Sequence, residues 1–282
     1  MTHAGPLPLS VAIVCKDGAR TIARTLDAVR PIAAEILALD SGSTDGTLDM
    51  LARAGARVVP TEWLGHVRTK QRALEACSQP WVLCLDADES PEPDLIEAIA
   101  GALAWPAAEQ LATAPEPVAF ALNRKVWYAG RFLNHAWQPE WRTRLVRGRD
   151  VAAGLAAWAG TDPHDALRTA AAPRRLRGTL RHDSFATFAE QLGKQVRYAG
   201  IQAGHMARRG DRGSLASLLI SPPGAFLKQL VLKAAWRDGW AGWLAAACAA
   251  QQALCKHAAL IELGRAEQRP DAGGAAAHPD NT

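Results

Sequence analysis

Apolar runs alternate with segments of helical periodicity through the first hundred residues of the chain. Compact apolar runs are typical of buried strands, and an apolar residue at every third or fourth position is typical of a helix that covers a sheet. We therefore expect strands at 9–15, 35–39, 57–59 and 81–85 and helices at 21–29, 47–54, 66–77 and 94–103. Strands that alternate with helices indicate an α/β fold with a mostly parallel sheet flanked by helices.

The pattern changes after residue 104. Residues 105–117 are rich in Pro and Ala and resemble a surface loop, whereas aromatic and basic residues interleave from 118 to 146. Helical periodicity dominates from 184 onward, at 191–206, 215–220 and 226–263. We expect an α/β domain at 1–170, a helical appendage at 171–265 and a disordered tail at 266–282, because the tail lacks apolar periodicity.

Composition sets bounds on the class of protein. With 282 residues, the chain can bury a sizeable core. The net charge of +4 is mild, but arginines gather at 124–149 and 174–181, where either an anionic partner or a set of solvated faces would explain them. The five cysteines are odd in number and lack metal-ligand spacing, which favours reduced thiols in the cytosol.

Targeting and membrane-spanning signals are weak. The first eight residues lack a basic region followed by an apolar stretch, so we expect no secretory signal. The nearest approach to an uncharged spanning segment is Ala241 to Ala250, which is short of the roughly 18 residues needed. We therefore expect the chain not to cross a bilayer.

Two carboxylates follow the predicted strand at 81–85. Asp86 and Asp88 lie one residue apart, so they share a face at a strand end and can converge on a hard divalent cation that also binds phosphate. The alternative is a solvated helix start ahead of Pro91. Because ligands bind beyond the carboxyl ends of parallel strands, the positions of Lys16, Asp40 and Asp86 at three such ends favour a nucleotide site.

The segment from Asp40 to Thr47, Asp-Ser-Gly-Ser-Thr-Asp-Gly-Thr, joins a predicted strand to a predicted helix. Its glycines allow a tight turn, and its short polar side chains can cap the helix. Capping alone does not require an acid at the last strand residue, so we expect Asp40 to hold a base or a ribose hydroxyl.

These motifs, in their order along the chain, carry a family resemblance. Val-Ala-Ile-Val-Cys-Lys-Asp, Asp-Ser-Gly-Ser-Thr-Asp-Gly-Thr and Leu-Asp-Ala-Asp-Glu resemble glycosyltransferase family 2, with the GT-A fold. More narrowly, the chain resembles the lipopolysaccharide core-biosynthesis glucosyltransferases of that family. The segments that carry the narrower likeness start at Trp137, Arg144, Pro163, Gly178 and Trp236.

The resemblance implies roles for residues of the donor site. Val14 and Lys16 would line the nucleotide pocket and Asp40 would contact the uridine. Ser41 stands where many members carry a second Asp that contacts the base, which weakens the inference of uracil specificity. Two further departures concern Gln71 and Asp17. Gln71 stands where an Asn is common, and the usual acid after the first strand is reduced to Asp17 followed by Gly18.

The resemblance also implies how the diphosphate is held. Asp86 and Asp88 would bind Mg or Mn, with Asp88 favoured as the direct ligand. Arg68 and Lys70 match a basic helix start near the diphosphate, and Arg144 matches an arginine that grips phosphate.

For the catalytic base, Asp165 in Pro-His-Asp matches a position where the subfamily has His-Glu. An inverting transfer needs a carboxylate within hydrogen-bond reach of the acceptor hydroxyl. Asp162 is a competing residue, and a loop acid without a catalytic role is the structural alternative.

Aromatic residues of the second half have two interpretations. Trp127, Tyr128, Trp137 and Trp141 could form an acceptor wall by stacking on sugar rings, or belong to a core. His182 could steady the acceptor loop or simply pack.

Three tryptophans gather near the end of the chain. Trp236, Trp240 and Trp243, with nearby cations, suit a membrane interface, although a helical hairpin packed on the catalytic domain is equally simple.

The expected function is therefore an inverting, metal-dependent transfer of a hexose, glucose from UDP-glucose, to a heptose of the lipopolysaccharide inner core. The expected partners are a nucleotide-sugar donor, a lipid-linked core acceptor and the cytoplasmic face of the inner membrane, bound peripherally, with no nucleic acid. A polyprenyl-phosphate glycosyltransferase and a catalytically silent nucleotide-sugar binding protein remain alternatives. An oxidoreductase is disfavoured because Cys15-Lys16-Asp17-Gly18 stands where Gly-x-Gly-x-x-Gly would begin.

Overall fold

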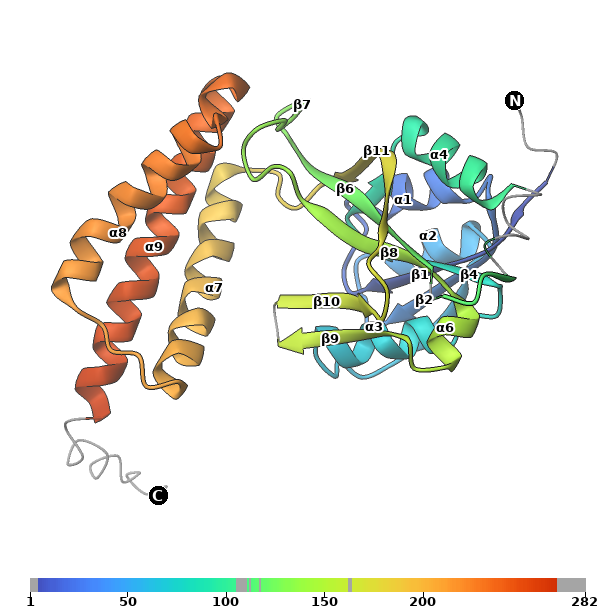
Figure 1. Cartoon of the computed structure of the whole chain (residues 1–282), viewed down its shortest axis with the longest axis horizontal. Coiled ribbons are helices and arrows are strands. Elements are labelled where there is room, and N and C mark those ends of the chain that lie inside the picture. The colour runs from blue at the N-terminus through green and yellow to red at the C-terminus, as the bar shows by residue number, and fades with distance from the viewer. Residues whose placement is uncertain (1–4, 105–110, 112, 117, 162–163, 268–282) are drawn as a thin grey trace, which may run out of the picture. The chain divides into compact units, whose positions relative to one another are not determined.

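The computed structural model describes residues 5–104, 111, 113–116, 118–161 and 164–267 (Figure 1). They form two compact units: the first comprises the described parts of Met1–Trp127 and Pro139–Ser184, and the second those of Tyr128–Gln138 and Phe185–Thr282. The division after Ser184 differs from the boundary expected at residue 170. Most of the expected tail, from residue 268 on, lies outside the described residues.

The first hundred residues form the predicted strands and helices. Their bounds are β1 (Leu7–Cys15), α1 (Ile22–Val29), β2 (Ala33–Asp40), α2 (Thr47–Arg53), β3 (Arg57–Pro60), α3 (His66–Glu75), β4 (Trp81–Asp86) and α4 (Pro93–Leu103). Every boundary lies within two residues of the one expected from apolar periodicity. The agreement follows from burial, because strands covered on both faces are apolar throughout.

The central sheet has the strand order β3-β2-β1-β4-β8-β6-β11-β5. Strands β3, β2, β1 and β4 are parallel. Beyond them lie β8 (Trp141–Arg147), antiparallel to β4, then β6 (Ala119–Tyr128), β11 (Arg174–His182) and the short β5 (Glu89–Pro91). The parallel register pairs Val14 with Asp86 and Cys15 with Asp40, so the carboxyl ends of β1, β2 and β4 coincide.

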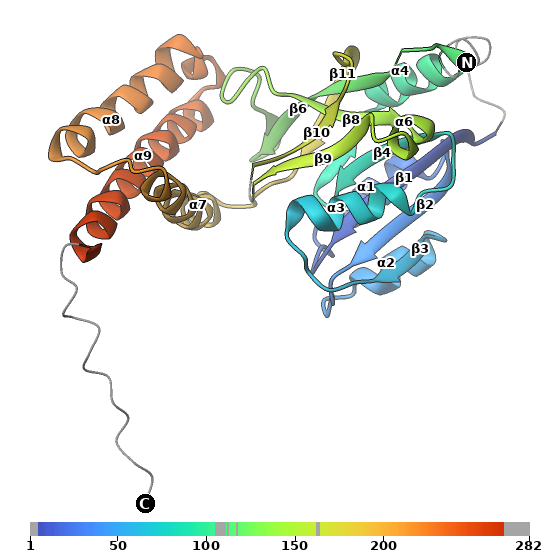
Figure 2. The same cartoon turned by 60° about the horizontal axis from the view of Figure 1, so that its bottom comes forward.

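Helices cover both faces of this sheet (Figure 2). On one face, alternate residues of β1 such as Val11 and Ile13 pack with Ile22 of α1 and Ile99 of α4. On the other face, Ala12 packs in a second core with Leu74 of α3 and with residues of the hairpin described below. The period of two along the strand thus builds two apolar layers around one sheet.

Strand β11 corrects the expectation of helix throughout 171–265. The residues at its two ends, Arg174–Arg175 and Thr179–His182, pair in parallel with β6, and the register shifts between these two stretches. Gly178 lies in this irregular stretch with φ +107°, and a Cβ there would lie 2.5 Å from the Cα of Leu95 in α4. The glycine is required both by the backbone conformation and by the close approach of the helix.

A two-stranded antiparallel sheet completes the first unit. It consists of β9 (Ala156–Thr161) and β10 (His164–Thr169), which follow the short helix α6 (Gly148–Ala152). Trp158 of β9 joins the core beneath α3. The hairpin thereby brings β10 close to the carboxyl end of the parallel strands.

The second unit is helical, apart from the short strand β7 (Arg131–Phe132). It contains α7 (Phe188–Arg208), α8 (Leu215–Leu227), the π-helical η1 (Lys228–Leu232), the 3-10 helix η2 (Ala235–Asp238) and α9 (Trp240–Glu267). Helices α7 and α8 pack against α9. The region 226–263 is interrupted because Ala234 and Gly239 both have positive φ.

Within this unit, Asp238 anchors the loop that follows β7. Its carboxylate accepts hydrogen bonds from the backbone amides of Asn134, His135 and Ala136 at 2.8 to 3.0 Å. The side chain is buried, so the carboxylate satisfies three amides that would otherwise lack partners.

Candidate active site

The carboxyl end of β4 carries the acid that the sequence predicted for the site. Asp86 Oδ1 lies 2.6 Å from Lys70 Nζ, and the same ammonium group lies 2.9 Å from Asp165 Oδ2 of β10. Helix α3 places Lys70 here because the lysine is on its buried face, with a side chain only 8% exposed. Residues separated by 95 positions in the chain therefore meet around one cation.

Charge neutralisation fixes the ionisation of these groups. Burial alone would raise the pKa of Asp165, but Lys70, with Arg144 and His66, holds it below its usual value. Burial would lower the pKa of Lys70, yet Asp86 and Asp165 raise it. At neutral pH both members of the Lys70–Asp165 pair are therefore charged.

A buried carboxylate, Glu89, lies beneath this cluster. Its oxygens accept hydrogen bonds from Arg144 Nη2 and Nε at 2.8 and 2.9 Å and from Arg124 Nη1 at 3.0 Å. Glu89 is fully buried, and although burial raises its pKa, the two arginines hold the pKa well below the ordinary value. Arg144 Nη2 also lies 3.4 Å from Asp86 Oδ2, so the network of Glu89, Arg124 and Arg144 is linked to the end of β4.

Asp88 points to a different partner. His182 Nε2 of β11 lies 3.4 Å from Asp88 Oδ2, and the Asp183 amide donates to the Asp88 carbonyl at 2.9 Å. The other ring nitrogen, His182 Nδ1, is buried and has no hydrogen-bond partner within the part of the chain that the structure describes. Burial raises the pKa of Asp88, but His182 lowers it below the usual value.

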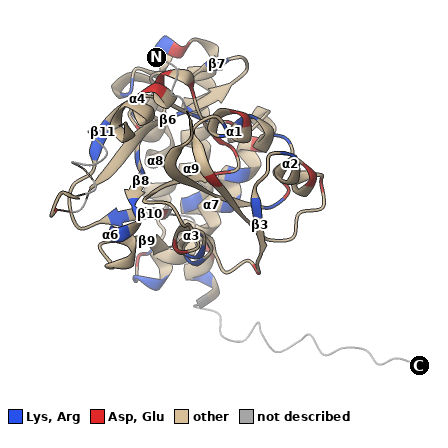
Figure 3. Cartoon of the chain, turned by 90° about the vertical axis from the view of Figure 1, so that its right-hand side faces the viewer, with Lys and Arg blue, Asp and Glu red and all other residues tan. Residues whose placement is uncertain are grey.

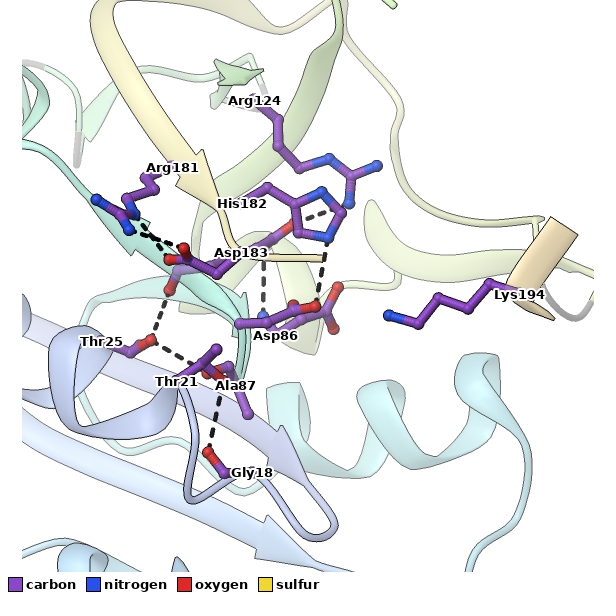
Figure 4. A network of polar contacts seen from close by, with 12 residues as sticks. Gly18, Thr21, Thr25, Asp86, Ala87, Arg124, Arg181, His182, Asp183 and Lys194 are labelled. Carbon is purple, nitrogen blue, oxygen red and sulfur yellow. Dashed lines mark hydrogen bonds and ion pairs between the residues drawn. The ribbon is translucent and has the colours of Figure 1, made fainter. Parts of the chain in front are cut away.

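The turn between Asp86 and Glu89 is held in place by its neighbours. Thr25 Oγ1 of α1 donates to the carbonyls of Ala87 and Glu89, at 3.3 and 2.9 Å (Figure 4). Asp183, which is bound to Asp88, also pairs with Arg181 at 2.7 Å. The turn is thus fixed by α1 on one side and by β11 on the other.

Asp40 serves the turn in which it lies. Its carboxylate accepts hydrogen bonds from the amides of Gly42 and Ser43, from the Ser43 hydroxyl and from the Cys15 thiol, and the residue is 4% exposed. Burial raises its pKa, but these donors lower it overall. Asp40 therefore acts as a turn residue in this structure, and its contact with uridine stays a prediction.

The neighbouring Ser41 has a buried hydroxyl without a partner among the described residues. Asp17, at the end of β1, accepts from the Thr44 amide at 2.8 Å, which joins the β1 and β2 loops. These two loops form the side of the site next to the β4 cluster.

The other predicted site residues divide into two groups. Val14 lines a small pocket, open to solvent, together with Lys70, Asp86 and Arg144. Lys16 and Arg68 are exposed and lie outside this cluster. Arg68 precedes Lys70 by two residues, about 200° around a helix, so the two cannot share a face. The competing base, Asp162, lies outside the described residues.

The sequence does not single out Trp158, yet this residue lines the same pocket. The ring centroid lies 4.8 Å from Lys70 Nζ and 5.4 Å from Arg144 Cζ. A cation held over an indole is stabilised by the ring quadrupole. The tryptophan thus fixes both cations of the cluster from one side.

The aromatic residues proposed as an acceptor wall lie in separate environments. In the first unit, Arg181 stacks over Trp127 at 4.0 Å and Arg175 over Trp141 at 4.9 Å. In the second unit, Trp137 has positive φ and packs edge-on against Phe185. The basic residues of the second half are spread over several elements, including β11 and α6 (Figure 3).

The chain is similar in sequence to known glycosyltransferases. Residues 10–143 match the family model described as glycosyl transferase family 2. The chain is 28% identical over 282 residues to the lipopolysaccharide core biosynthesis glycosyltransferase LpsC of Rhizobium meliloti, which covers 96% of this chain and 98% of that protein. An uncharacterized glycosyltransferase of Rickettsia felis is 37% identical over 91 residues, about a third of either chain.

Among solved structures, glucosyl-3-phosphoglycerate synthase from Mycobacterium tuberculosis, in complex with Mn²⁺, UDP and glucosyl-3-phosphoglycerate, aligns at 27% identity and a TM-score of 0.31. The alignment covers 44% of this chain and 45% of that chain, which is less than half of either.

The protein is a glycosyltransferase, and its residues 10–143 are similar to family 2 of these enzymes. Over nearly its whole length the chain is similar to a glycosyltransferase of lipopolysaccharide core biosynthesis.

Proposed function

We propose that this glycosyltransferase transfers a hexose, glucose from UDP-glucose, with inversion to a heptose of the lipopolysaccharide inner core, and that it needs a divalent metal ion. The geometry that carries the proposal is the meeting of Asp86 and Asp165 around Lys70, where Lys70 and Asp86 line a small pocket at the carboxyl end of β4. The acceptor class follows from the similarity to LpsC, whose name places it in core biosynthesis.

The residues at the end of β4 fit a divalent ion. Asp88 offers an ionised carboxylate with 30% of its side chain exposed, and His182 Nε2 lies beside it. The described residues contain no group of three or more acidic, His or Cys side chains that could hold a metal. A metal that shares its shell with two phosphates and water needs only one or two protein ligands, which suits Mg or Mn.

Asp88 and His182 would hold this ion, whereas Asp86 turns its oxygens toward Lys70 and Arg144. When bound, the ion neutralises the charge that develops on the leaving diphosphate.

The cations of the pocket support the same step. Lys70 and Arg144 are buried, charged and fixed over Trp158. A diphosphate in the pocket would replace Asp86 as the partner of these two cations. A fixed cation in a water-poor site stabilises an anion strongly. Both side chains thus bind the donor and stabilise its leaving group.

Asp165 would act as the base. Its lowered pKa keeps it ionised, so it can accept the acceptor hydroxyl proton at Oδ2 as the new glycosidic bond forms. Inversion requires this carboxylate on the sugar face opposite the diphosphate. Its ion pair with Lys70 fixes its orientation.

The acceptor is lipid-linked in this proposal, so the enzyme would work at the cytoplasmic face of the inner membrane as a peripheral protein. The direct test is transfer of labelled glucose from UDP-glucose, with Mn present, to delipidated core heptose and, separately, to polyprenyl phosphate. We expect product only with the heptose acceptor, with inverted anomeric configuration and loss of activity on chelation. Transfer to polyprenyl phosphate alone, or donor binding without turnover, would overturn the proposal.

A further inference from the structure

Helix α8 presents its most apolar side chains to solvent. Its exposed positions recur every four residues, which is one face of a helix, and Leu219 and Ile220 on this face are 72% and 70% exposed. The opposite, less exposed side includes Ser217 and Phe226, whose ring lies 6.1 Å from that of Trp243 in α9. A surface helix of a water-soluble protein has the reverse arrangement.

The apolar face continues into η1. Val231 and Leu232 are 58% and 79% exposed, and Lys228 is the only charged residue from Leu215 to Leu232. Among the described helices, this 18-residue stretch is the one long and apolar enough, by length and composition, to cross a membrane. It replaces Ala241 to Ala250 as the nearest approach to a span.

Aromatic and basic residues border this face. Trp236, Trp240 and Trp243 are each more than half exposed. Residues 208–239 contain six basic and two acidic residues. One of the two acids, Asp238, is buried and bound to three backbone amides. Exposed tryptophans and an excess of cations beside an apolar face are the features that recognise the headgroups of anionic lipids.

We propose that this surface, the α8 face, docks in the plane of an anionic lipid bilayer. The α8 face consists of Leu215, Leu219, Ile220, Leu227, Val231 and Leu232. Its side chains enter the boundary between headgroups and acyl chains, and the tryptophans lie at headgroup depth. The inference gives the proposed function a means of reaching a lipid-anchored acceptor, and it rests on that function for its purpose alone.

Docking in the plane, rather than crossing, follows from the packing of α8. The helix stays against α9, which carries Lys256, Glu262 and Arg265, and α9 in turn packs on α7. A crossing α8 would draw these charged neighbours into hydrocarbon, which is costly. The two successive prolines, Pro222 and Pro223, also suit an interfacial helix whose backbone groups can reach water.

The test is sedimentation of the full-length protein with vesicles. Phosphatidylglycerol mixed with phosphatidylethanolamine should bind the protein, and pure phosphatidylcholine should bind it much less, with the difference reduced by salt. We expect the double variant L219S/I220S to partition about ten- to a hundredfold more weakly into the anionic vesicles. Leu232→Ser, at the most exposed position, gives a second, milder variant.

Leu155→Ser is the matched control, because it removes an exposed leucine, 39% accessible, from the first unit. It should bind vesicles like the wild type. Equal binding by L219S/I220S and wild type, or an equal loss in the control, would overturn the inference. The inference would also be overturned if the wild type were a dimer that does not bind vesicles and L219S/I220S were a monomer, because a second copy would then cover the α8 face.

UDP-glucose hydrolysis separates this inference from the proposed function. Hydrolysis should be the same in wild type and L219S/I220S, since the α8 face belongs to the second unit and the residues assigned to catalysis belong to the first. If no form turns over the donor while vesicle binding follows the prediction, the proposed function fails and the α8 face stands.

Discussion

Replacing Glu89 by Gln removes one charge from a buried ionic network of the α/β unit. Glu89 accepts three hydrogen bonds from Arg144 and Arg124, and all three side chains are at most 14% exposed. Arg124 keeps a second carboxylate in Glu140, at 2.6 Å, whereas the remaining contact of Arg144 with a carboxylate, Asp86, is longer, at 3.4 Å. The substitution therefore leaves a buried guanidinium short of negative charge.

The cost of removing one partner of a buried ion pair is about 3–5 kcal/mol. Because Gln retains the shape of the side chain and one acceptor oxygen, we expect the lower end, roughly 3 kcal/mol. That is a large share of a stability of about 5–15 kcal/mol for a typical domain. It corresponds to roughly a hundredfold in the opening equilibrium of the unit.

Hydrogen exchange of the β4 amides measures this equilibrium, since these amides are in the core of the first unit and report its opening alone. Arg142→Gln is the control, because Arg142 pairs with Glu140 of the same network but is 38% exposed, where a pair contributes at most about 1 kcal/mol. If the β4 amides of Glu89→Gln exchanged as slowly as those of Arg142→Gln, the charges of the Glu89–Arg144–Arg124 network would not stabilise the unit.

Three further predictions concern single carboxylates. Although burial raises the pKa of Glu35, hydrogen bonds from Ser10 and Ser78 outweigh burial and lower the pKa to about 2. The ionised carboxylate therefore stabilises the fold fully above pH 4.5, and this stabilisation is lost as the pH falls toward 2. The free energies of unfolding of Glu35→Gln and wild type should differ most above pH 4.5 and converge in acid, and a difference that stays constant with pH would contradict this. Asp165→Asn should lower kcat by about 10²–10⁴ with little change in the donor KM, and Asp165→Glu should restore part of it; an active Asn variant would exclude Asp165 as the base. Asp238→Asn should destabilise the helical unit by about 1–3 kcal/mol in thermal unfolding, because it weakens three bonds to buried amides, and an unchanged midpoint would refute this.

The sequence predicted the parallel half of the fold well because its signals are local. Each strand there is an apolar run and each helix an amphipathic one, so Asp40 and Asp86 were placed at strand ends before any coordinates. The family resemblance singles out Lys70 and Asp165, and the structure brings the two side chains together in an ion pair, while their roles stay predictions.

What could not be predicted depends on contacts across the sheet. Glu89 was part of a recognised motif but had no role, because its partners Arg124 and Arg144 lie 35 and 55 residues away on β6 and β8. The sequence does not predict strand β11 because its arginines suggest a basic surface, whereas its pairing with β6 and β5 shows that it is a strand. His182 depends on that same pairing to meet Asp88.

The placement of Arg68 beside Lys70 illustrates a different limit. Neighbouring basic residues were grouped by sequence, but the helical period separates their faces. The sequence does not single out the outward apolar face of α8, because Lys228 interrupts its apolar run.

The central claim is that the turn after β4 holds a divalent ion together with the diphosphate of a nucleotide-sugar. The most direct measurement is the shift in melting temperature of wild type and Asp88→Asn on addition of UDP, with and without Mn, with the exposed Asp27→Asn as control. At a UDP concentration a hundred times Kd the wild type should gain about 2.7 kcal/mol, only with Mn, and the control should match it. Asp88→Asn should lose the Mn-dependent part; a full Mn-dependent shift in that variant would contradict the claim.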